Sequence, residues 1–182
     1  MANKSETIPG CERDNLMATL DFINATLTVP WVITYGTLLG SMRSGRHISH
    51  ETDIDVSVED TYWIEAIDQL AQAARAHAHF ELAENPSSYH LARVSYSASN
   101  TVHTDIWSYE RGEACSAFVS TKRIHIDNDA IFPFARCTYE HGEYPCPHDS
   151  LSVVAKMYGA GWRTPKRKCP QGSQACPGAP LR

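Results

Sequence analysis

The chain has 182 residues, of which 42% are hydrophobic, with a formal net charge of −5 at pH 7 and an isoelectric point near 6.0. This length supports one hydrophobic core better than two independent ones. The negative charge disfavours a general nucleic-acid-binding protein, and no apolar stretch reaches the roughly 18–20 residues that span a bilayer. We therefore expect one domain over residues 1–165, followed by a flexible basic tail rich in proline and glycine over residues 166–182.

Hydrophobic residues follow helical spacing in some segments and alternate in others. The expected elements, in chain order, are a helix over 11–28, a strand over 32–35, a short helix after Gly36, a strand over 53–58, a helix over 61–78, a turn at 85–88, strands over 89–96, 102–109 and 114–120, and a helix over 149–158. Asp149 or Ser150 is the expected cap of the last helix, and Gly159 its end. This order predicts an α/β or α+β domain with a mixed sheet flanked by helices.

Two aspartates separated by one apolar residue are the strongest chemical signal in the chain. Asp53 and Asp55 alternate with apolar residues, so a strand there directs both carboxylates to one face. For an Asp-x-Asp pair alone, the better interpretation is a surface strand with two solvated acids. The preceding glycine-rich segment and Arg43 favour a divalent-metal site with a phosphate bound nearby.

Four sequence blocks resemble the LicD and fukutin family of phosphotransferases. They are YGTLLG at residues 35–40 with Arg43, Gly45, Ile48, Asp53 and Asp55; VHTDIW at 102–107; IFP at 131–133; and Tyr158, Gly159, Trp162 and Pro165 near the end. The resemblance implies a nucleotidyltransferase-like fold and a LicD-like catalytic domain over residues 1–165. It also implies transfer of a phosphorylated alcohol, such as phosphocholine or ribitol phosphate, from a CDP-linked donor to a glycan hydroxyl.

The family's metal-binding set corresponds to three aspartates here. Asp53, Asp55 and Asp105 are the expected catalytic residues and the ligands of Mg²⁺ or Mn²⁺, and Asp105 is also the candidate base toward the acceptor hydroxyl. The expected substrate-binding residues are Tyr35, Gly36, Thr37, Leu38, Gly40, Arg43, His50 and His103. Most of the nine histidines are expected at the surface, whereas Trp31, Trp107 and Trp162 are expected in the core.

The chain departs from the family pattern at residues 49–52, where Ser-His-Glu-Thr replaces Pro-Trp and further aspartates. This departure keeps open a catalytically silent binding or scaffold domain. A nucleotidyltransferase that transfers the nucleotide itself is a further alternative, because Gly40, Ser41, Arg43 and Gly45 before Asp-x-Asp resemble small antibiotic-modifying members of that fold.

The number and spacing of the cysteines do not decide in which cellular compartment the protein resides. An even number permits three disulfides without requiring them, and no close Cys-x-x-Cys pair supports a zinc ribbon. The six are Cys11, Cys115, Cys137, Cys146, Cys169 and Cys176. The N-terminus lacks the apolar run of a signal peptide, so the sequence as it stands predicts a cytoplasmic protein. The Golgi lumen is expected instead if the chain is a fragment of a eukaryotic member.

Overall fold

The computed structural model describes residues 10–77, 79–85, 91–97, 102–119 and 123–165. Its helices are α1 (Gly10–Thr26), α2 (Tyr35–Ser44), the 3-10 turn η1 (Asp60–Tyr62), α3 (Trp63–Ala76), α4 (Asn128–Ile131) and α5 (Ser150–Tyr158). Its strands are β1 (Trp31–Ile33), β2 (Asp53–Glu59), β3 (Glu81–Asn85), β4 (Leu91–Ser95), β5 (His103–Arg111), β6 (Cys115–Val119), β7 (Arg123–Asp127), β8 (Ala135–Tyr139) and β9 (Gly142–Cys146).

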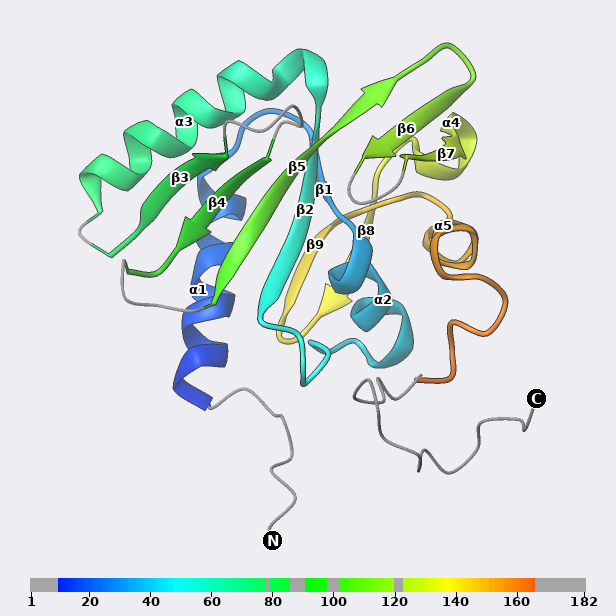
Figure 1. Cartoon of the computed structure of the whole chain (residues 1–182), viewed down its shortest axis with the longest axis horizontal. Coiled ribbons are helices and arrows are strands. Elements are labelled where there is room, and N and C mark those ends of the chain that lie inside the picture. Colours follow the sequence, from blue (N-terminus) through cyan, green and yellow to red (C-terminus); the bar gives the residue numbers. More distant parts are fainter. Residues whose placement is uncertain (1–9, 78, 86–90, 98–101, 120–122, 166–182) are drawn as a thin grey trace, which may run out of the picture.

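A mixed sheet forms the centre of the molecule (Figure 1). Its strand order is β1-β2-β5-β4-β3, and β6 and β7 extend it from the far end of β5. Only the β2–β5 pairing is parallel among the described strands; the other pairings are antiparallel. The predicted mixed sheet flanked by helices is confirmed, and β2 and β5, which carry the three aspartates, are neighbours.

The two faces of β2 differ as the alternation predicts. Ile54, Val56 and Val58 are fully buried. Thr104, which pairs with Ile54 on β5, shares a 2.7 Å hydrogen bond with Thr19 of α1. The apolar face therefore packs against α1 and α3, and the aspartates of β2 point to the opposite face, where α2 lies.

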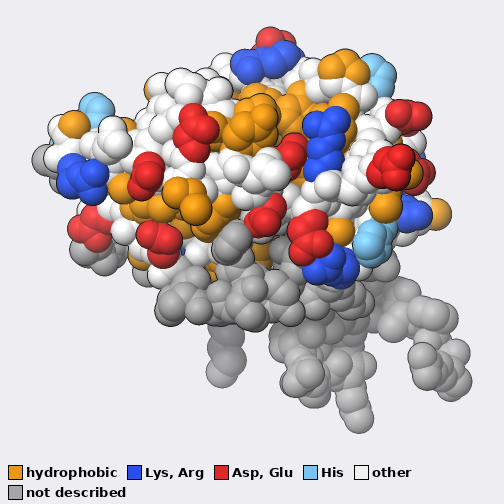
Figure 2. Space-filling view, turned by 90° about the horizontal axis from the view of Figure 1, so that it is seen from above, with side chains coloured by type: hydrophobic (Ala, Val, Ile, Leu, Met, Phe, Trp, Pro, Cys, Tyr) orange, Lys and Arg blue, Asp and Glu red, His pale blue; other side chains and the backbone are white. Residues whose placement is uncertain are grey.

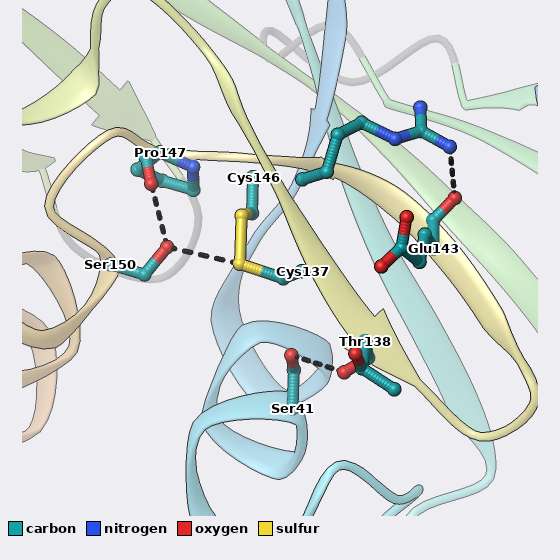
Figure 3. The surroundings of a disulfide bond; sticks show 8 residues. Ser41, Cys137, Thr138, Glu143, Cys146, Pro147 and Ser150 are labelled. Atoms are coloured by element: carbon teal, nitrogen blue, oxygen red, sulfur yellow. Dashed lines mark hydrogen bonds between the residues drawn. A yellow bond between two sulfur atoms is a disulfide. The ribbon is translucent and has the colours of Figure 1, made fainter.

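A separate hairpin, formed by β8 and β9, packs against β1 and α2. A disulfide joins Cys137 to Cys146 across the two strands, with their Cα atoms 5.8 Å apart (Figure 3). Ser41 on α2 donates a 2.8 Å hydrogen bond to the backbone carbonyl of Thr138. The hairpin thus fixes the position of α2, whose N-terminal end faces β2.

Several expected boundaries require correction. Tyr35 begins α2 rather than ending a strand, and the first helix ends at Thr26 rather than at residue 28. The strands β3, β7, β8 and β9 were not expected. The last helix is confirmed, because Asp149 caps it by accepting from the backbone N–H of Ser152, and Gly159 follows its last residue. The expected turn at 85–88 and the tail over 166–182 lie largely or wholly outside the described residues.

Gly40 lies inside α2 with no room for a side chain. A Cβ atom built there would be 2.5 Å from the backbone oxygen of Arg46. The backbone of Arg46 cannot easily move to relieve this contact. We expect Gly40→Ala to lower the free energy of unfolding by about 1–2 kcal/mol, because overpacking outweighs the gain of about 1 kcal/mol in helix propensity. Thermal unfolding checks this, with Gly161→Ala as the control, since its Cβ meets nothing within 4 Å. Equal melting temperatures for the two variants would contradict the tight packing.

No helix among the described residues is long and apolar enough to cross a membrane. Figure 2 shows one face of the molecule, on which acidic side chains are scattered among hydrophobic and uncharged ones and basic side chains are few. Among the described residues on this face, no continuous basic surface is visible. That the chain does not bind nucleic acid stays a prediction.

Candidate metal centre

The parallel pairing of β2 with β5 brings the acidic residues together. Asp53 pairs with His103, and Asp55 pairs with Asp105. Because paired residues in neighbouring strands point to the same face, all four side chains lie on the side of the sheet where α2 begins. Asp53, His103 and Asp105 each offer one ligand atom, and these three atoms lie within 4.8 Å of one another.

Asp105 is buried and held by two basic groups. Its side chain is only 5% exposed. Its Oδ1 accepts a 2.7 Å hydrogen bond from Nε of Arg93, the residue that pairs with it on β4, and lies 3.3 Å from Nε2 of His103. The ion pair with Asp105 raises the pKa of Arg93 above its ordinary value, so the guanidinium stays charged. Both contacts use Oδ1, so Oδ2 is directed elsewhere and can be offered to a cation.

Asp55 has a different environment from the other two aspartates. Its Oδ2 accepts a 3.1 Å hydrogen bond from the backbone N–H of Gly36, and its Oδ1 accepts a 3.0 Å bond from the indole of Trp107. Burial, and then the nearby charge of Asp53, raise the pKa of Asp55 to about 7. Asp55 therefore retains a proton at pH values where an ordinary carboxyl is ionised. The prediction that it shares the ion with Asp53 and Asp105 stays a prediction.

The donor set at this centre fits a divalent cation. Two carboxylates supply the hard oxygen ligands of Mg²⁺ and Mn²⁺, while an imidazole nitrogen suits transition metals such as Mn²⁺ better than Mg²⁺. Burial is the main cause of the raised pKa of Asp55, and the charges of Asp53 and, more weakly, Asp105 add to it; a cation at the centre would offset these charges. Asp53, His103 and Asp105 are thus the residues that would hold the metal, with Asp55 beside them.

The expected substrate-binding residues at the start of α2 divide into two groups. Tyr35 and Gly36 lie next to the centre, the Tyr35 ring being 5.9 Å from that of Trp107. Thr37 is buried, and its Oγ1 accepts a 2.7 Å hydrogen bond from the backbone N–H of Asp55. Leu38 is completely buried in the core, and Gly40 is buried against Arg46. The first group can face a substrate, whereas Thr37, Leu38 and Gly40 build the scaffold.

The predicted phosphate cradle of the glycine turn and Arg43 is not assembled as expected. Arg43 lies in the last turn of α2, seven residues after Gly36, so the two are separated by roughly 10 Å along the helix axis. Its Nε donates a 2.6 Å hydrogen bond to the backbone oxygen of Trp162, after α5. His50 is exposed and lies 3.5 Å from the carboxylate of Glu51. Arg43 and His50 line a pocket of their own, away from the glycine turn.

Sequence reasoning missed two residues at the centre. Arg93 was not singled out, because no local pattern indicates that an arginine on β4 pairs with Asp105. Trp107 was expected in the core, but it is half-buried and its indole donates to Asp55. The signal for Trp107 was its spacing, since it lies two residues after Asp105 and therefore on the same face of β5. Trp31 and Trp162 are buried, as expected.

The raised pKa of Asp55 predicts how stability depends on pH without metal. The pKa of Asp55 is about 7 in the folded protein and has the ordinary carboxyl value of 3.8 in the unfolded chain. The folded state therefore binds more protons between these values, so stability is fully present below about pH 4 and is lost as pH rises through 7. The loss has an upper bound of about 4 kcal/mol. Divalent metal should restore more stability at pH 8 than at pH 5.

This dependence can be measured by thermal unfolding in a metal chelator across pH 4–8. Asp55→Asn, which is neutral at every pH, should show a flatter curve than the wild-type protein. Asp68→Asn, at an exposed position on α3, is the matched control and should keep the wild-type slope. Equal slopes for Asp55→Asn and the wild-type protein would show that Asp55 does not hold its proton in the folded state.

Comparisons with known proteins identify the family of the chain. The family described as LicD/FKTN/FKRP, nucleotidyltransferase domain, matches residues 28–149, which is more than half of the chain and includes both β2 and β5. No curated protein is similar enough to the chain to count as a match.

Solved structures similar to the chain are nucleotidyltransferases with low sequence identity. The lincosamide antibiotic adenylyltransferase LnuA, lincomycin-bound, has a TM-score of 0.50 at 13% identity, covering 86% of this chain and 89% of that chain. ANT(2″)-Ia in complex with adenylyl-2″-tobramycin has a TM-score of 0.48 at 13% identity, covering 84% and 76%. Terminal uridylyl transferase 4 from Trypanosoma brucei with bound GTP has a TM-score of 0.37 at 19% identity, covering 59% of this chain and 32% of that chain. The likeness to LnuA shows the nucleotidyltransferase fold, and the family match shows that the chain belongs to the LicD family.

Proposed function

We propose that the protein is a metal-dependent phosphotransferase that moves a phosphorylated alcohol from a CDP-linked donor to a glycan hydroxyl. The observation that carries this proposal is the convergence of Asp53, His103 and Asp105 within 4.8 Å on two parallel strands. Membership of the LicD family supports the reaction class. The choice between Mg²⁺ and Mn²⁺ and the identity of both substrates belong to the proposal.

The residues of the centre have separate tasks in this reaction. Asp53, His103 and Asp105 would hold the cation, which when bound would supply positive charge against the donor diphosphate. The acceptor oxygen attacks the phosphorus that carries the alcohol, the anhydride bond to CMP breaks, and CMP leaves. Asp105 accepts the proton of the attacking hydroxyl, since the hydrogen bond from Arg93 to its Oδ1 holds the carboxylate in place.

The alternative of nucleotide transfer draws less support from the residues that suggested it. Ser41, one of the residues on which that resemblance rests, is only 7% exposed, and its hydroxyl donates to the Thr138 carbonyl of β8. Its hydroxyl is thus engaged within the scaffold rather than offered to a phosphate. The scaffold alternative is disfavoured because the metal-binding side chains remain together despite the departure at residues 49–52.

The leaving group distinguishes these functions. The protein should be incubated with Mn²⁺ or Mg²⁺ and either a CDP-linked alcohol or CTP, with a panel of glycans as acceptors. Transfer of the phosphorylated alcohol releases CMP, whereas transfer of the nucleotide releases pyrophosphate, and phosphorus NMR separates the two products. Release of pyrophosphate alone would establish nucleotide transfer. Metal-dependent nucleotide binding without either product would favour the scaffold.

We also propose that the protein folds in an oxidising compartment. The Cys137–Cys146 disulfide supports this, because structural disulfides persist in secreted and lumenal proteins and are rare in the cytosol. The Golgi lumen satisfies this condition, whereas the cytoplasm does not. Mass spectrometry of the protein from its native source, without reduction, should find the peptides of β8 and β9 linked. Free thiols at both cysteines in that sample would favour the cytoplasm.

A further inference from the structure

The segment that leads from α2 to the metal centre forms no helix or strand. It covers residues 45–52, all of which the structure describes, and ends where Asp53 begins β2. Hydrogen bonds to the turn of the β8–β9 hairpin hold this segment instead (Figure 1). Because Asp53 is the first residue of its strand, its place in the sheet is supported by regular pairing on one side only, and the segment supports the other side.

Glu140, in the hairpin turn, holds the backbone of this segment at two points. Its backbone N–H donates a 2.7 Å hydrogen bond to the carbonyl of Gly45, and its Oε1 accepts a 2.6 Å bond from the backbone N–H of His47. The carboxylate is only 6% exposed and pairs with Arg13 of α1. Although burial acts in the opposite direction, the hydrogen bonds from His47 and Arg13 keep the pKa of Glu140 below its ordinary value. The bond to His47 is therefore charge-assisted and strong.

The imidazole of His47 makes a hydrogen bond at each ring nitrogen. Nδ1 lies 2.6 Å from the phenol oxygen of Tyr139, and Nε2 lies 2.9 Å from the backbone oxygen of Glu51. A carbonyl oxygen can only accept, so Nε2 carries the hydrogen, and Nδ1 of the neutral ring accepts from Tyr139. Burial, and then the charge of Glu140, raise the pKa of the Tyr139 phenol, so it keeps the proton that it donates. The ring thus ties Glu51 to the hairpin.

Asp53 depends on this tie more than the other two aspartates do. The side chains of Asp55 and Asp105 are held by hydrogen bonds of their own. Glu51 precedes Asp53 by two residues, which is at most about 7 Å of extended chain, so a shift of the Glu51 carbonyl is passed on to Asp53. Ligand atoms must lie within about 0.2 Å of their ideal distance from a metal ion, so even a small shift weakens the site.

We propose that His47 is a positioning residue for the metal centre. Through the bond from Nε2 to the Glu51 carbonyl, it fixes the path by which the chain enters β2 and so places Asp53 for the cation. The inference rests on the proposed function, since it assigns a task to a residue outside the proposed metal-binding set. If His47 only stabilised the fold, the affinity for metal would instead follow the melting temperature.

Comparing His47→Gln with His47→Asn in the full chain tests this role. The amide nitrogen of Gln can take the place of Nε2 and donate to Glu51, whereas the shorter Asn reaches only the place of Nδ1, beside Tyr139. Each variant keeps one of the two ring hydrogen bonds, so we expect similar melting temperatures. We expect His47→Asn to bind Mn²⁺ about tenfold more weakly than the wild-type protein in calorimetry, and His47→Gln to stay within about threefold. His125→Asn, at an exposed position on β7, is the matched control and should keep the wild-type affinity.

Transfer rates add a measurement that a change in stability alone would not move. Excess Mn²⁺ should restore most of the activity of His47→Asn, because this variant binds the cation too weakly. Excess donor should not restore it, since His47 does not contact the substrate in this role.

The outcomes separate this inference from the proposed function. Equal Mn²⁺ affinities in His47→Asn and His47→Gln, or wild-type affinity in His47→Asn, would overturn the role of His47 and leave the proposed function standing. Release of pyrophosphate alone by a wild-type protein that binds Mn²⁺ would overturn the proposed function, whereas the role of His47 would stand if His47→Asn alone bound Mn²⁺ weakly. A wild-type protein that binds no divalent cation would overturn both.

Discussion

Asp53→Asn is expected to lower metal-dependent phosphotransfer by about a thousandfold while leaving the protein folded. The carboxylate is one of three groups that would hold the cation, and losing a ligand removes several kcal/mol of transition-state stabilisation, at about 1.4 kcal/mol per tenfold in rate. Asn keeps the shape of the Asp53 side chain but not its negative charge. Removing one of several clustered acids also relieves repulsion in the metal-free protein, so its melting temperature should not fall.

The measurement combines transfer rate, Mn²⁺ affinity by calorimetry and thermal unfolding. Asp68→Asn is the matched control, because it makes the same charge change at an exposed position of α3, against the opposite face of the sheet. This control should retain activity and metal affinity. Unchanged Mn²⁺ affinity in Asp53→Asn would remove Asp53 from the metal set, and unchanged activity would contradict its role in the reaction.

The core of the centre could be predicted from the sequence because it depends on local periodicity. Asp53 and Asp55 lie on one face of a strand wherever that strand is placed, and the same alternation puts His103, Asp105 and Trp107 on one face of β5. The resemblance to the LicD family grouped the three aspartates at one site, but the parallel pairing of β2 with β5 was not predicted. The residues alone do not specify which strands pair.

Other features depend on pairings between distant segments. Arg93 reaches Asp105 only because β4 runs antiparallel to β5 in one particular register. The β8–β9 hairpin and its disulfide likewise depend on which cysteines the fold brings together, and the even number of cysteines left this open. A shift of one residue in the β4–β5 register would turn Arg93 to the other face, so no local pattern could reveal the ion pair.

Arg43 shows how a motif can mislead when it is treated as a compact unit. Arg43 follows Gly36 by only seven residues. If these residues formed a turn, Arg43 and Gly36 could both contact one phosphate. The intervening residues form a helix, because Leu38 and Leu39 pack into the core from one side of it, and the helix moves Arg43 to the far end. The residues of the motif thus divide between the metal centre and a separate pocket that Arg43 lines.

Arg93→Gln is expected to lower transfer activity by about 10- to 100-fold, the usual effect of losing a residue that orients a metal ligand. The guanidinium holds Oδ1 of the buried Asp105, and Gln can neither match its charge nor keep that geometry. The variant also leaves a carboxylate that is 5% exposed without its cation. Because Arg93 itself is half-exposed, we expect a destabilisation of about 1–3 kcal/mol, below the value for a fully buried pair.

Arg93→Lys separates orientation from charge, because Lys keeps the positive charge but lacks the N–H donor that meets Asp105. If orientation matters, this variant should lose about tenfold in activity while its melting temperature recovers part of the loss seen in Arg93→Gln. Arg123→Gln is the matched control: Arg123 is 48% exposed against 49% for Arg93, and it pairs at 2.6 Å with Glu110, which is 54% exposed. That control should change activity little, since an exposed ion pair contributes about 0–1 kcal/mol. Full activity in Arg93→Lys would show that charge alone suffices, and full activity in Arg93→Gln would mean that Asp105 needs no partner to act.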